Sequence, residues 1–324
     1  MSQIPVTILT GFLGSGKTTL LNRILTEQHG QKIAVIENEF GEAGIDNELL
    51  VQDRNEQIIE MNNGCICCTV RGDLVRILGE LQKKKDAGKV KFDRVIIETT
   101  GLADPAPVAQ TFFVEDNVKS NYILDAIITM VDAKHAPQQL DEHHEAQEQV
   151  GFADRILISK SDIVNKDEVT SLRERLTRMN KRAKISISDH GKAPIVDLLD
   201  IKGFRLDDIL EIEPNFLTDV DHEHDDDVNS FVFRELKPLN LEKLEDLFGF
   251  LVKQYGTQMM RYKGILNIKN VNLRVIFQGV HMIMGAVDGA KWGKNEQRES
   301  KIVFIGKNLP KEKILSALKS CIAA

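Results

Sequence analysis

The pattern Gly11-x-x-x-x-Gly16-Lys17-Thr18 has the residue types and the spacing of a phosphate-binding loop. It follows an apolar run and opens a helical pattern over Lys17–Glu27, which is the setting that such a loop requires. Glycines let backbone N–H groups turn toward phosphate oxygens, and the helix N-terminus adds positive potential there. The residues predicted to bind a nucleoside triphosphate are Gly11, Gly14, Ser15, Gly16, Lys17, Thr18 and Thr19.

A second apolar run, Arg94–Glu98, ends in a carboxylate and is followed by Gly101. A phosphate loop needs an acidic strand end of this kind near Mg²⁺ and the γ-phosphate. Glu98 is expected either to hold Mg²⁺ or to orient the attacking water, and the Gly101 N–H to contact the γ-phosphate. Lys17 would bridge the β- and γ-phosphates, and the Thr18 hydroxyl would coordinate Mg²⁺. Lys17, Glu98 and Gly101 are therefore the predicted catalytic residues.

The base of the nucleotide is indicated by Ser159-Lys160-Ser161-Asp162, which follows the apolar run Arg155–Ser159. It resembles the guanine-reading element Asn-Lys-x-Asp, with a serine in the place of asparagine. The Asp162 carboxylate can accept both N–H donors of guanine, a pair that adenine lacks, and the Lys160 stem would lie over the base. The segment predicts GTP rather than ATP.

The segment Gly64-Cys65-Ile66-Cys67-Cys68 places three thiols within four residues. Soft thiolates select Zn²⁺ or Cu⁺ over Mg²⁺, and three ligands leave one position of a tetrahedral metal open. The spacing of Cys65 and Cys68 also fits a redox pair, and buried structural cysteines are a third interpretation. Metal binding is the interpretation that the crowding favours.

Three carboxylates, Glu37, Glu39 and Glu42, follow the apolar run Lys32–Glu37. Their place at the carboxyl end of a predicted strand favours a role in binding Mg²⁺ or another metal. A solvated acidic turn is the alternative.

These residues are positioned by alternating strand and helix patterns. Near-continuous Val, Ile and Leu runs are typical of parallel strands that helices cover on both faces. The alternation predicts a doubly wound, mostly parallel α/β domain over residues 1–215, with its ligands at the carboxyl ends of the strands. The predicted strands are Val6–Thr10, Lys32–Glu37, Arg94–Glu98, Leu124–Val131 and Arg155–Ser159.

Composition changes sharply after this domain. Every residue from Asp219 to Asp227 except Val220 is Asp, Glu or His, so residues 216–229 are predicted to be a linker. Auxiliary metal buffering by His222 and His224 stays open beside that interpretation. A smaller α+β domain is predicted over residues 230–324. Its predicted elements are the strands Ser230–Leu236, Gly264–Ile268, Leu273–Phe277 and Lys301–Ile305 and the helices Leu241–Tyr255 and Lys311–Cys321.

The composition excludes several other classes of protein. The chain has 324 residues, 42% of them apolar, and 42 basic against 49 acidic side chains give a net charge of −7. An acidic balance argues against a nucleic-acid-binding surface, which needs clustered Lys and Arg. No run of 18 apolar residues predicts a membrane span, and the N-terminus lacks the basic region of a signal peptide. A cytoplasmic location is expected.

Several motifs together resemble one family. TGFLGSGKTTLLNRIL, IENEFGE, NGCICC, ETTGLADP and SKSD, in this order, resemble the CobW-type metallochaperone GTPases, most closely the YjiA-type bacterial members. The resemblance continues at Arg261-Tyr262-Lys263-Gly264 and so covers nearly the whole chain. It implies a SIMIBI-like P-loop GTPase that carries zinc on its cysteines and delivers it to client proteins. It also implies an internal site in which Glu37, Glu42 and Cys67 meet a metal ion.

The motifs lead to one hypothesis. GTP·Mg²⁺ orders the segments around Glu37–Glu42 and Gly101 and brings the cysteines into a zinc-binding geometry; hydrolysis then releases zinc to a zinc-requiring client protein. Three alternatives stay open: a P-loop kinase of a small molecule with structural cysteines, a metal buffer or sensor that delivers no cargo, and a GTPase that inserts cobalt or nickel. Assembly into a homo-oligomer also stays open.

Overall fold

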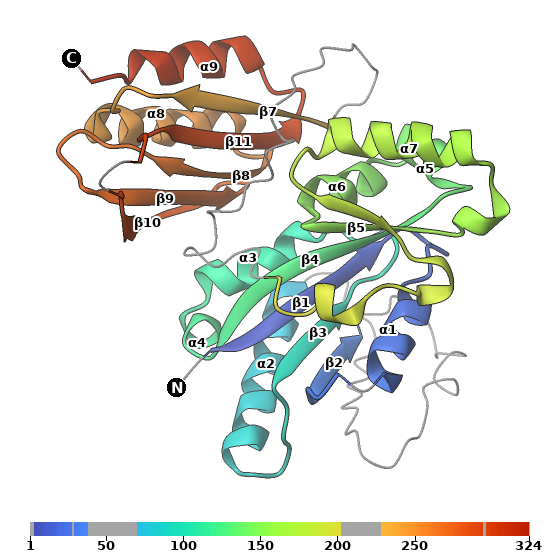
Figure 1. Ribbon diagram of the computed structural model, residues 1–324. Helices are drawn as coiled ribbons and strands as arrows, with labels where there is room; N and C mark the ends of the chain where they lie inside the picture. Colours follow the sequence, from blue (N-terminus) through green and yellow to red (C-terminus); the bar gives the residue numbers. More distant parts are fainter. Residues whose placement is uncertain (1–2, 28, 38–69, 202–227, 294–295, 324) are drawn as a thin grey trace. The chain divides into compact units, whose positions relative to one another are not determined.

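The computed structural model describes residues 3–27, 29–37, 70–201, 228–293 and 296–323 (Figure 1). By contacts the chain divides into two compact units. One unit is Met1–Glu174 with Ala183–Phe204, and the other is Arg175–Arg182 with Arg205–Ala324. Each unit is described by itself. The domain bounds 1–215, 216–229 and 230–324 stay a prediction.

The first unit is built on a six-stranded sheet in which every strand pair is parallel, with the order β2-β3-β1-β4-β5-β6 (Figure 1). β3 lies on one side of β1 and β4 on the other, so the order of the strands reverses direction at β1. At such a switch point, the carboxyl ends of the strands border a crevice in which a ligand can bind. The strands are β1 (Ile4–Gly11), β2 (Ile33–Glu37), β3 (Arg94–Glu98), β4 (Tyr122–Asp132), β5 (Arg155–Ser159) and β6 (Lys184–Ile187). The predicted doubly wound α/β fold is confirmed.

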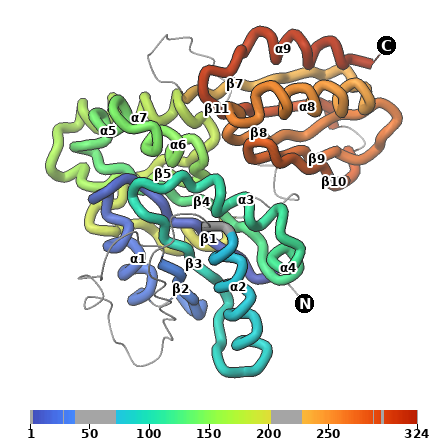
Figure 2. Tube along the Cα trace, turned by 180° about the vertical axis from the view of Figure 1, so that it is seen from behind, coloured from blue at the N-terminus to red at the C-terminus, as the bar shows by residue number. Residues whose placement is uncertain are grey.

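Helices cover both faces of this sheet. On one face α1 buries Leu20, Leu21 and Ile24 against the strands, together with residues 193–199. Opposite views show α2, α3 and α6 on the other face (Figures 1 and 2). The helices are α1 (Lys17–Thr26), α2 (Val70–Asp86), α3 (Ala106–Val114), α4 (Asp116–Lys119), α5 (Ala136–Glu142), α6 (His144–Phe152) and α7 (Lys166–Met179).

The second unit is a five-stranded antiparallel sheet with the order β10-β9-β8-β11-β7. Two helices pack on one face over a core that includes Phe231, Phe277 and Phe304. The elements are β7 (Val228–Glu235), α8 (Leu241–Tyr255), β8 (Met259–Leu266), β9 (Leu273–Val280), β10 (Ile283–Lys291), β11 (Ser300–Lys307) and α9 (Lys311–Ser320). This is the predicted α+β architecture.

Two strands were not predicted, β6 and β10. Both lie at a sheet edge, where one side of the strand is unpaired and few side chains need be apolar. β6 has four residues, all at least partly exposed, and β10 carries two glycines among mostly exposed residues. Neither shows the buried apolar run that marks the central strands. Among the helices that the structure describes, none has the length and hydropathy to cross a membrane.

Candidate functional site

The carboxyl ends of the strands gather the predicted site residues at one edge of the parallel sheet. Glu98 at the end of β3 lies in register with Leu9 of β1 on one side and with Glu37 of β2 on the other. Asp132 at the end of β4 pairs with Ser159 at the end of β5. Side chains that are distant in the sequence therefore meet around the loop that follows β1.

The loop after β1 has the backbone of a phosphate cradle. Gly11, Gly14 and Gly16 have φ angles of 141°, 73° and 98°, in the region that favours glycine. At Gly11 a Cβ atom would lie 2.4 Å from the Met130 carbonyl oxygen, so no other residue fits there without a shift. The buried Ser15 hydroxyl has no hydrogen-bond partner within the described part of the chain. A buried polar atom without a partner fits a loop shaped to receive a phosphate oxygen.

Lys17 and Thr18 begin α1 at the mouth of this loop. The half-buried Lys17 ammonium donates to the Gly11 carbonyl at 2.8 Å. Burial lowers the pKa of Lys17, and the nearby Glu98 carboxylate raises it in part. Thr18 Oγ1 donates to Glu98 Oε1 at 3.2 Å, so the two predicted oxygen ligands of Mg²⁺ are already in contact. Thr19, the next residue, is exposed.

Gly101 touches the loop directly. A Cβ atom at Gly101 would lie 2.6 Å from the Leu13 backbone nitrogen, so the two backbones pack closely. Gln149 of α6, a residue that the sequence analysis missed, donates to the carbonyls of Gly101 and Ala103 at 3.0 Å each. Because the Gln149 side chain is buried, it fixes the backbone that carries the predicted γ-phosphate contact.

The predicted base-reading residues form a loop that is tied down at several points. Ser159, which stands in the place of asparagine, donates from Oγ to the Ser15 carbonyl at 2.7 Å and so links β5 to the phosphate loop. Lys160 has a φ of 57°, in the left-handed region that lysine rarely occupies. Ser161 is held by Asp189, which accepts from its N–H at 2.7 Å and from its hydroxyl at 2.6 Å.

Two residues of this loop have partners that the sequence analysis did not identify. The Lys160 ammonium lies 2.6 Å from the Asp132 carboxylate, and His190 Nε2 lies 3.3 Å from Asp162 Oδ2. Burial alone would raise the pKa of Asp132. Hydrogen bonds from Lys160, from His135 and from backbone N–H groups outweigh burial and lower it.

The residues present fit Mg²⁺ as a cofactor of a bound nucleotide. The Thr18 hydroxyl and the Glu98 carboxylate supply the hard oxygen donors that this ion prefers, and their contact puts both at one point of the site. When bound, Mg²⁺ would neutralise charge on the phosphate oxygens.

The predicted metal ligands fall mostly outside the described residues. Glu37 is described, at the end of β2 and in register with Glu98. Glu39, Glu42, Cys65, Cys67 and Cys68 lie in residues 38–69, outside the described ranges, as do His222 and His224. Among the residues that are described, no three His, Cys, Asp or Glu side chains form a group that could hold a metal ion.

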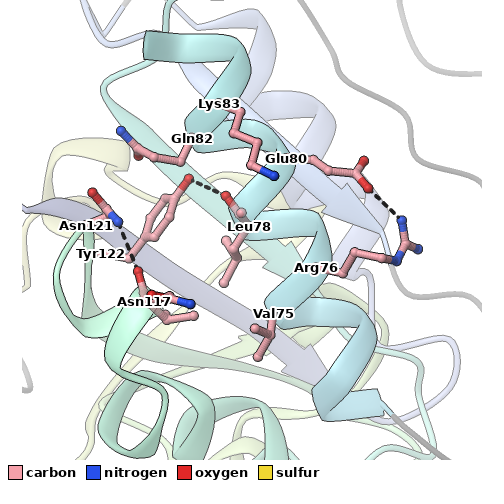
Figure 3. A pocket seen from close by; sticks show the side chains of 11 residues that line it. Val75, Arg76, Leu78, Glu80, Gln82, Lys83, Asn117, Asn121 and Tyr122 are labelled. Atoms are coloured by element: carbon pink, nitrogen blue, oxygen red, sulfur yellow. Dashed lines mark hydrogen bonds and ion pairs between the residues drawn. The ribbon is translucent and has the colours of Figure 1, made fainter.

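A pocket of about 460 Å³ lies elsewhere on the first unit, between α2 and the corner where α4 meets β4 (Figure 3). Its walls include Arg76, Lys83 and Asn117, and Tyr122 donates from its hydroxyl to the Leu78 carbonyl at 3.0 Å. Tyr122 is the first residue of β4, so the pocket lies at the opposite end of the sheet from the phosphate loop. None of the predicted site residues lines it.

Comparison with known proteins finds matches to both parts of the chain. The family model described as CobW/HypB/UreG, nucleotide-binding domain, matches residues 5–187, and the cobalamin synthesis protein cobW C-terminal domain matches residues 228–322. The zinc chaperone YjiA of Escherichia coli is 42% identical over 318 residues, which cover 98% of each chain. The zinc-regulated GTPase metalloprotein activator 1 of Schizosaccharomyces pombe is 31% identical, over 95% of this chain and 84% of its own.

A solved structure shows the same likeness over its whole length. The Zn(II)-bound YjiA GTPase from E. coli superposes with a TM-score of 0.80 at 39% identity and covers 100% of both chains. The parallel six-stranded sheet with its covering helices is the P-loop GTPase fold of this family. The chain belongs to the CobW family and is a P-loop GTPase whose nucleotide-binding domain is followed by a cobW C-terminal domain.

Proposed function

We propose that this GTPase binds Zn²⁺ through Cys65, Cys67 and Cys68 and transfers it to zinc-requiring client proteins in a step timed by GTP hydrolysis. The observation that carries the proposal is the register of Glu37 with Glu98. Glu98 contacts Thr18 of the phosphate loop, and the stretch of sequence that bears Cys65, Cys67 and Cys68 follows Glu37, the last residue of β2. That segment is therefore attached to the nucleotide site at its first residue.

The same segment rejoins the described structure close to the cysteines. Helix α2 begins at Val70, two residues after Cys68. If a change at the γ-phosphate moves the end of β2, the movement can therefore be transmitted along the chain to the thiols. Segments that respond to the γ-phosphate through its Mg²⁺ are the usual switches of P-loop GTPases.

The names of similar proteins support zinc as the cargo. YjiA is a zinc chaperone, and the fission yeast relative is a zinc-regulated GTPase metalloprotein activator. The chemistry of this chain agrees, because three thiolates suit Zn²⁺ and leave one coordination position open for a client's ligand. Glu37, Glu39 and Glu42 would supply oxygen ligands beside the thiolates or hold Mg²⁺.

Hydrolysis itself is assigned to residues of the phosphate site. The Lys17 ammonium and the loop N–H groups stabilise negative charge on the phosphates, and the Gly101 N–H contacts the γ-phosphate. Glu98 either holds Mg²⁺ with Thr18 or orients the attacking water; the 3.2 Å contact between Thr18 and Glu98 is compatible with both roles. Lys160 and Asp162 select guanine.

The energy scale explains why transfer needs a nucleotide. Structural zinc sites bind with about 10–16 kcal/mol, so unassisted release from such a site is very slow. A nucleotide-dependent change of about 3–5 kcal/mol would alter occupancy by orders of magnitude.

Zinc release during one round of hydrolysis tests this proposal. The zinc-loaded protein is mixed with GTP·Mg²⁺, or with a non-hydrolysable analogue, in the presence of a chromogenic zinc chelator. We expect zinc to reach the chelator at the rate of hydrolysis with GTP and far more slowly with the analogue. Equal release rates with GTP, with the analogue and without nucleotide would contradict the proposal.

A matched pair of cysteine variants makes the assay specific. The C65A/C67A/C68A variant should lose the releasable zinc and should still hydrolyse GTP·Mg²⁺ when no zinc is added. Cys321→Ala removes a buried thiol of the second unit, whose Sγ lies 3.5 Å from the Lys243 carbonyl oxygen, and should release zinc as the unaltered protein does. Zinc bound equally by both variants would place the cargo elsewhere.

A further inference from the structure

Asp132 is a buried carboxylate at the nucleotide edge of the sheet to which no role has yet been given. It is the last residue of β4, its side chain is 2% exposed, and it lies in register with Ser159. It accepts hydrogen bonds from the Lys160 ammonium at 2.6 Å, from His135 Nδ1 at 2.9 Å and from the backbone N–H groups of Lys134 and His135. A buried carboxylate with this many donors stays ionised and fixed in place.

The residue that Asp132 holds is in a conformation that needs support. Lys160 adopts a φ of 57°, and a residue with a Cβ atom pays a steric cost in the left-handed region. Its side chain is 39% exposed, so in water it would sample many rotamers. The ion pair with Asp132 selects one of them and secures the far end of the aliphatic stem.

The other anchors of this loop act on different residues. Ser159 bonds to the phosphate loop, Ser161 bonds to Asp189, and Asp162 lies beside His190. Among these described contacts, the Lys160 ammonium is bound by Asp132, and the other contacts hold Ser159, Ser161 and Asp162. The loop backbone can therefore stay in place when Asp132 is altered, while the Lys160 side chain becomes free.

We propose that Asp132 is a positioning residue of the nucleobase subsite: its carboxylate holds the Lys160 side chain so that the stem covers one face of the guanine base. This inference rests on the guanine assignment of Lys160 and Asp162. Since Asp132 acts through Lys160, its loss should weaken binding of the base without changing the chemistry at the γ-phosphate.

The test compares GDP affinity and GTP turnover in full-length variants. Asp132→Asn keeps the shape and removes the charge. We expect the Kd for GDP and the KM for GTP to rise about tenfold, the scale of one lost charge-assisted hydrogen bond, and kcat to change less than about twofold. In a Lys160→Ala background the same change should alter the Kd for GDP by less than about twofold, because the two residues act as one unit.

The same strand offers a matched control. Asp125 is 1% exposed, near the amino-terminal end of β4, and pairs with the buried Arg94 at 2.6 Å. Asp125→Asn removes a buried ion pair of the same length at the other end of the strand. It should lower the melting temperature and leave the Kd for GDP within about twofold.

Four results would overturn the proposal. One is an Asp132→Asn variant whose GDP affinity is unchanged while Lys160→Ala binds GDP more weakly. Another is a double variant whose losses multiply, since independent residues contribute additively to the binding free energy. The third is an equal loss of GDP affinity in Asp125→Asn, which would mark general destabilisation. The fourth is an unchanged GDP affinity in Lys160→Ala, because Lys160 then does not cover the base and there is nothing for Asp132 to position; zinc release is tested separately and does not depend on this result.

Discussion

At the scale of single residues, we expect the protonation of Lys17 to couple nucleotide binding to pH. Burial lowers the pKa of this ammonium in the free protein below its ordinary 10.5. Phosphate oxygens favour the charged form, so nucleotide binding at Lys17 is expected to raise the pKa again and to take up protons between the two values. GDP affinity should stay level near neutral pH and fall as the pH rises through the pKa of free Lys17.

Calorimetry of GDP binding across this pH range checks that expectation against Lys17→Met. The guanine base also loses a proton in alkali, but it does so with either protein, so the difference between the two curves belongs to the lysine. The variant should bind more weakly at every pH and show the smaller alkaline decline. Parallel curves would mean that Lys17 does not titrate in this range.

We expect Glu98 to contribute to the chemical step rather than to binding of the nucleoside. Its carboxylate accepts from Thr18 at 3.2 Å, beside the position predicted for Mg²⁺ and the γ-phosphate. Glu98→Ala should lower kcat by about 100-fold, the usual scale for losing one preorganised electrostatic group. Single-turnover hydrolysis measures this loss. If kcat is unaltered, Glu98 is not a catalytic residue. If the variant loses only affinity for GDP, measured without Mg²⁺, Glu98 has a purely structural role.

At the scale of elements, the close approach of the β3–α3 loop to the phosphate loop is a point of steric sensitivity. A Cβ atom at Gly101 would lie 2.6 Å from the Leu13 backbone nitrogen, which is too close for atoms that are not bonded. Gly101→Ala should therefore displace one loop, lower GDP affinity at least about tenfold and reduce the melting temperature.

Gly79 gives the matched control for that substitution. It lies in α2, and a Cβ atom there meets nothing within 4 Å. Gly79→Ala should be neutral or stabilise the helix by about 0.5–1 kcal/mol, with GDP affinity unchanged. The account of the loop contact fails if the two alanine variants bind GDP equally well.

The elements were predictable where a side-chain pattern had to match burial. β3 and β5 have the predicted bounds because both are apolar runs covered on both faces, and α8 has them because its apolar stripe repeats at helical spacing. β6 and β10 were not predicted because edge strands do not need a run of buried apolar residues. The periodicity of apolar residues indicates which side chains are buried, so it does not predict strands whose residues are mostly exposed.

The site was predictable where its residues are close in sequence. The phosphate loop and the strand end at Glu98 can be recognised from the spacing of residues that are close in the sequence. Asp132 and His190 cannot, because each contacts its partner across 28 residues. The pairing of β4 with β5 brings Asp132 to Lys160, and the pairing of β5 with β6 precedes the segment that carries His190. An acidic strand end after Leu124–Val131 was the available signal for Asp132. The roles of all these residues stay predictions until variants are measured.

At the scale of the whole molecule, the CobW C-terminal unit has its own core and can be considered apart from the GTPase chemistry. Its buried aromatics pack with each other, as in the stacked rings of Phe231 and Phe304, whose centroids are 5.2 Å apart. The proposed zinc cycle needs only the first unit and the cysteine segment.

The central claim is that the nucleotide state sets the zinc affinity of the cysteine segment. Its most direct test is the zinc Kd of the full-length protein, measured with competing chelators in GTP analogue·Mg²⁺, in GDP and without nucleotide. We predict the tightest binding with the analogue, with a difference from GDP of at least about 100-fold, or roughly 3 kcal/mol. The difference should vanish in the C65A/C67A/C68A variant. Equal zinc affinities in all three nucleotide states would contradict the account.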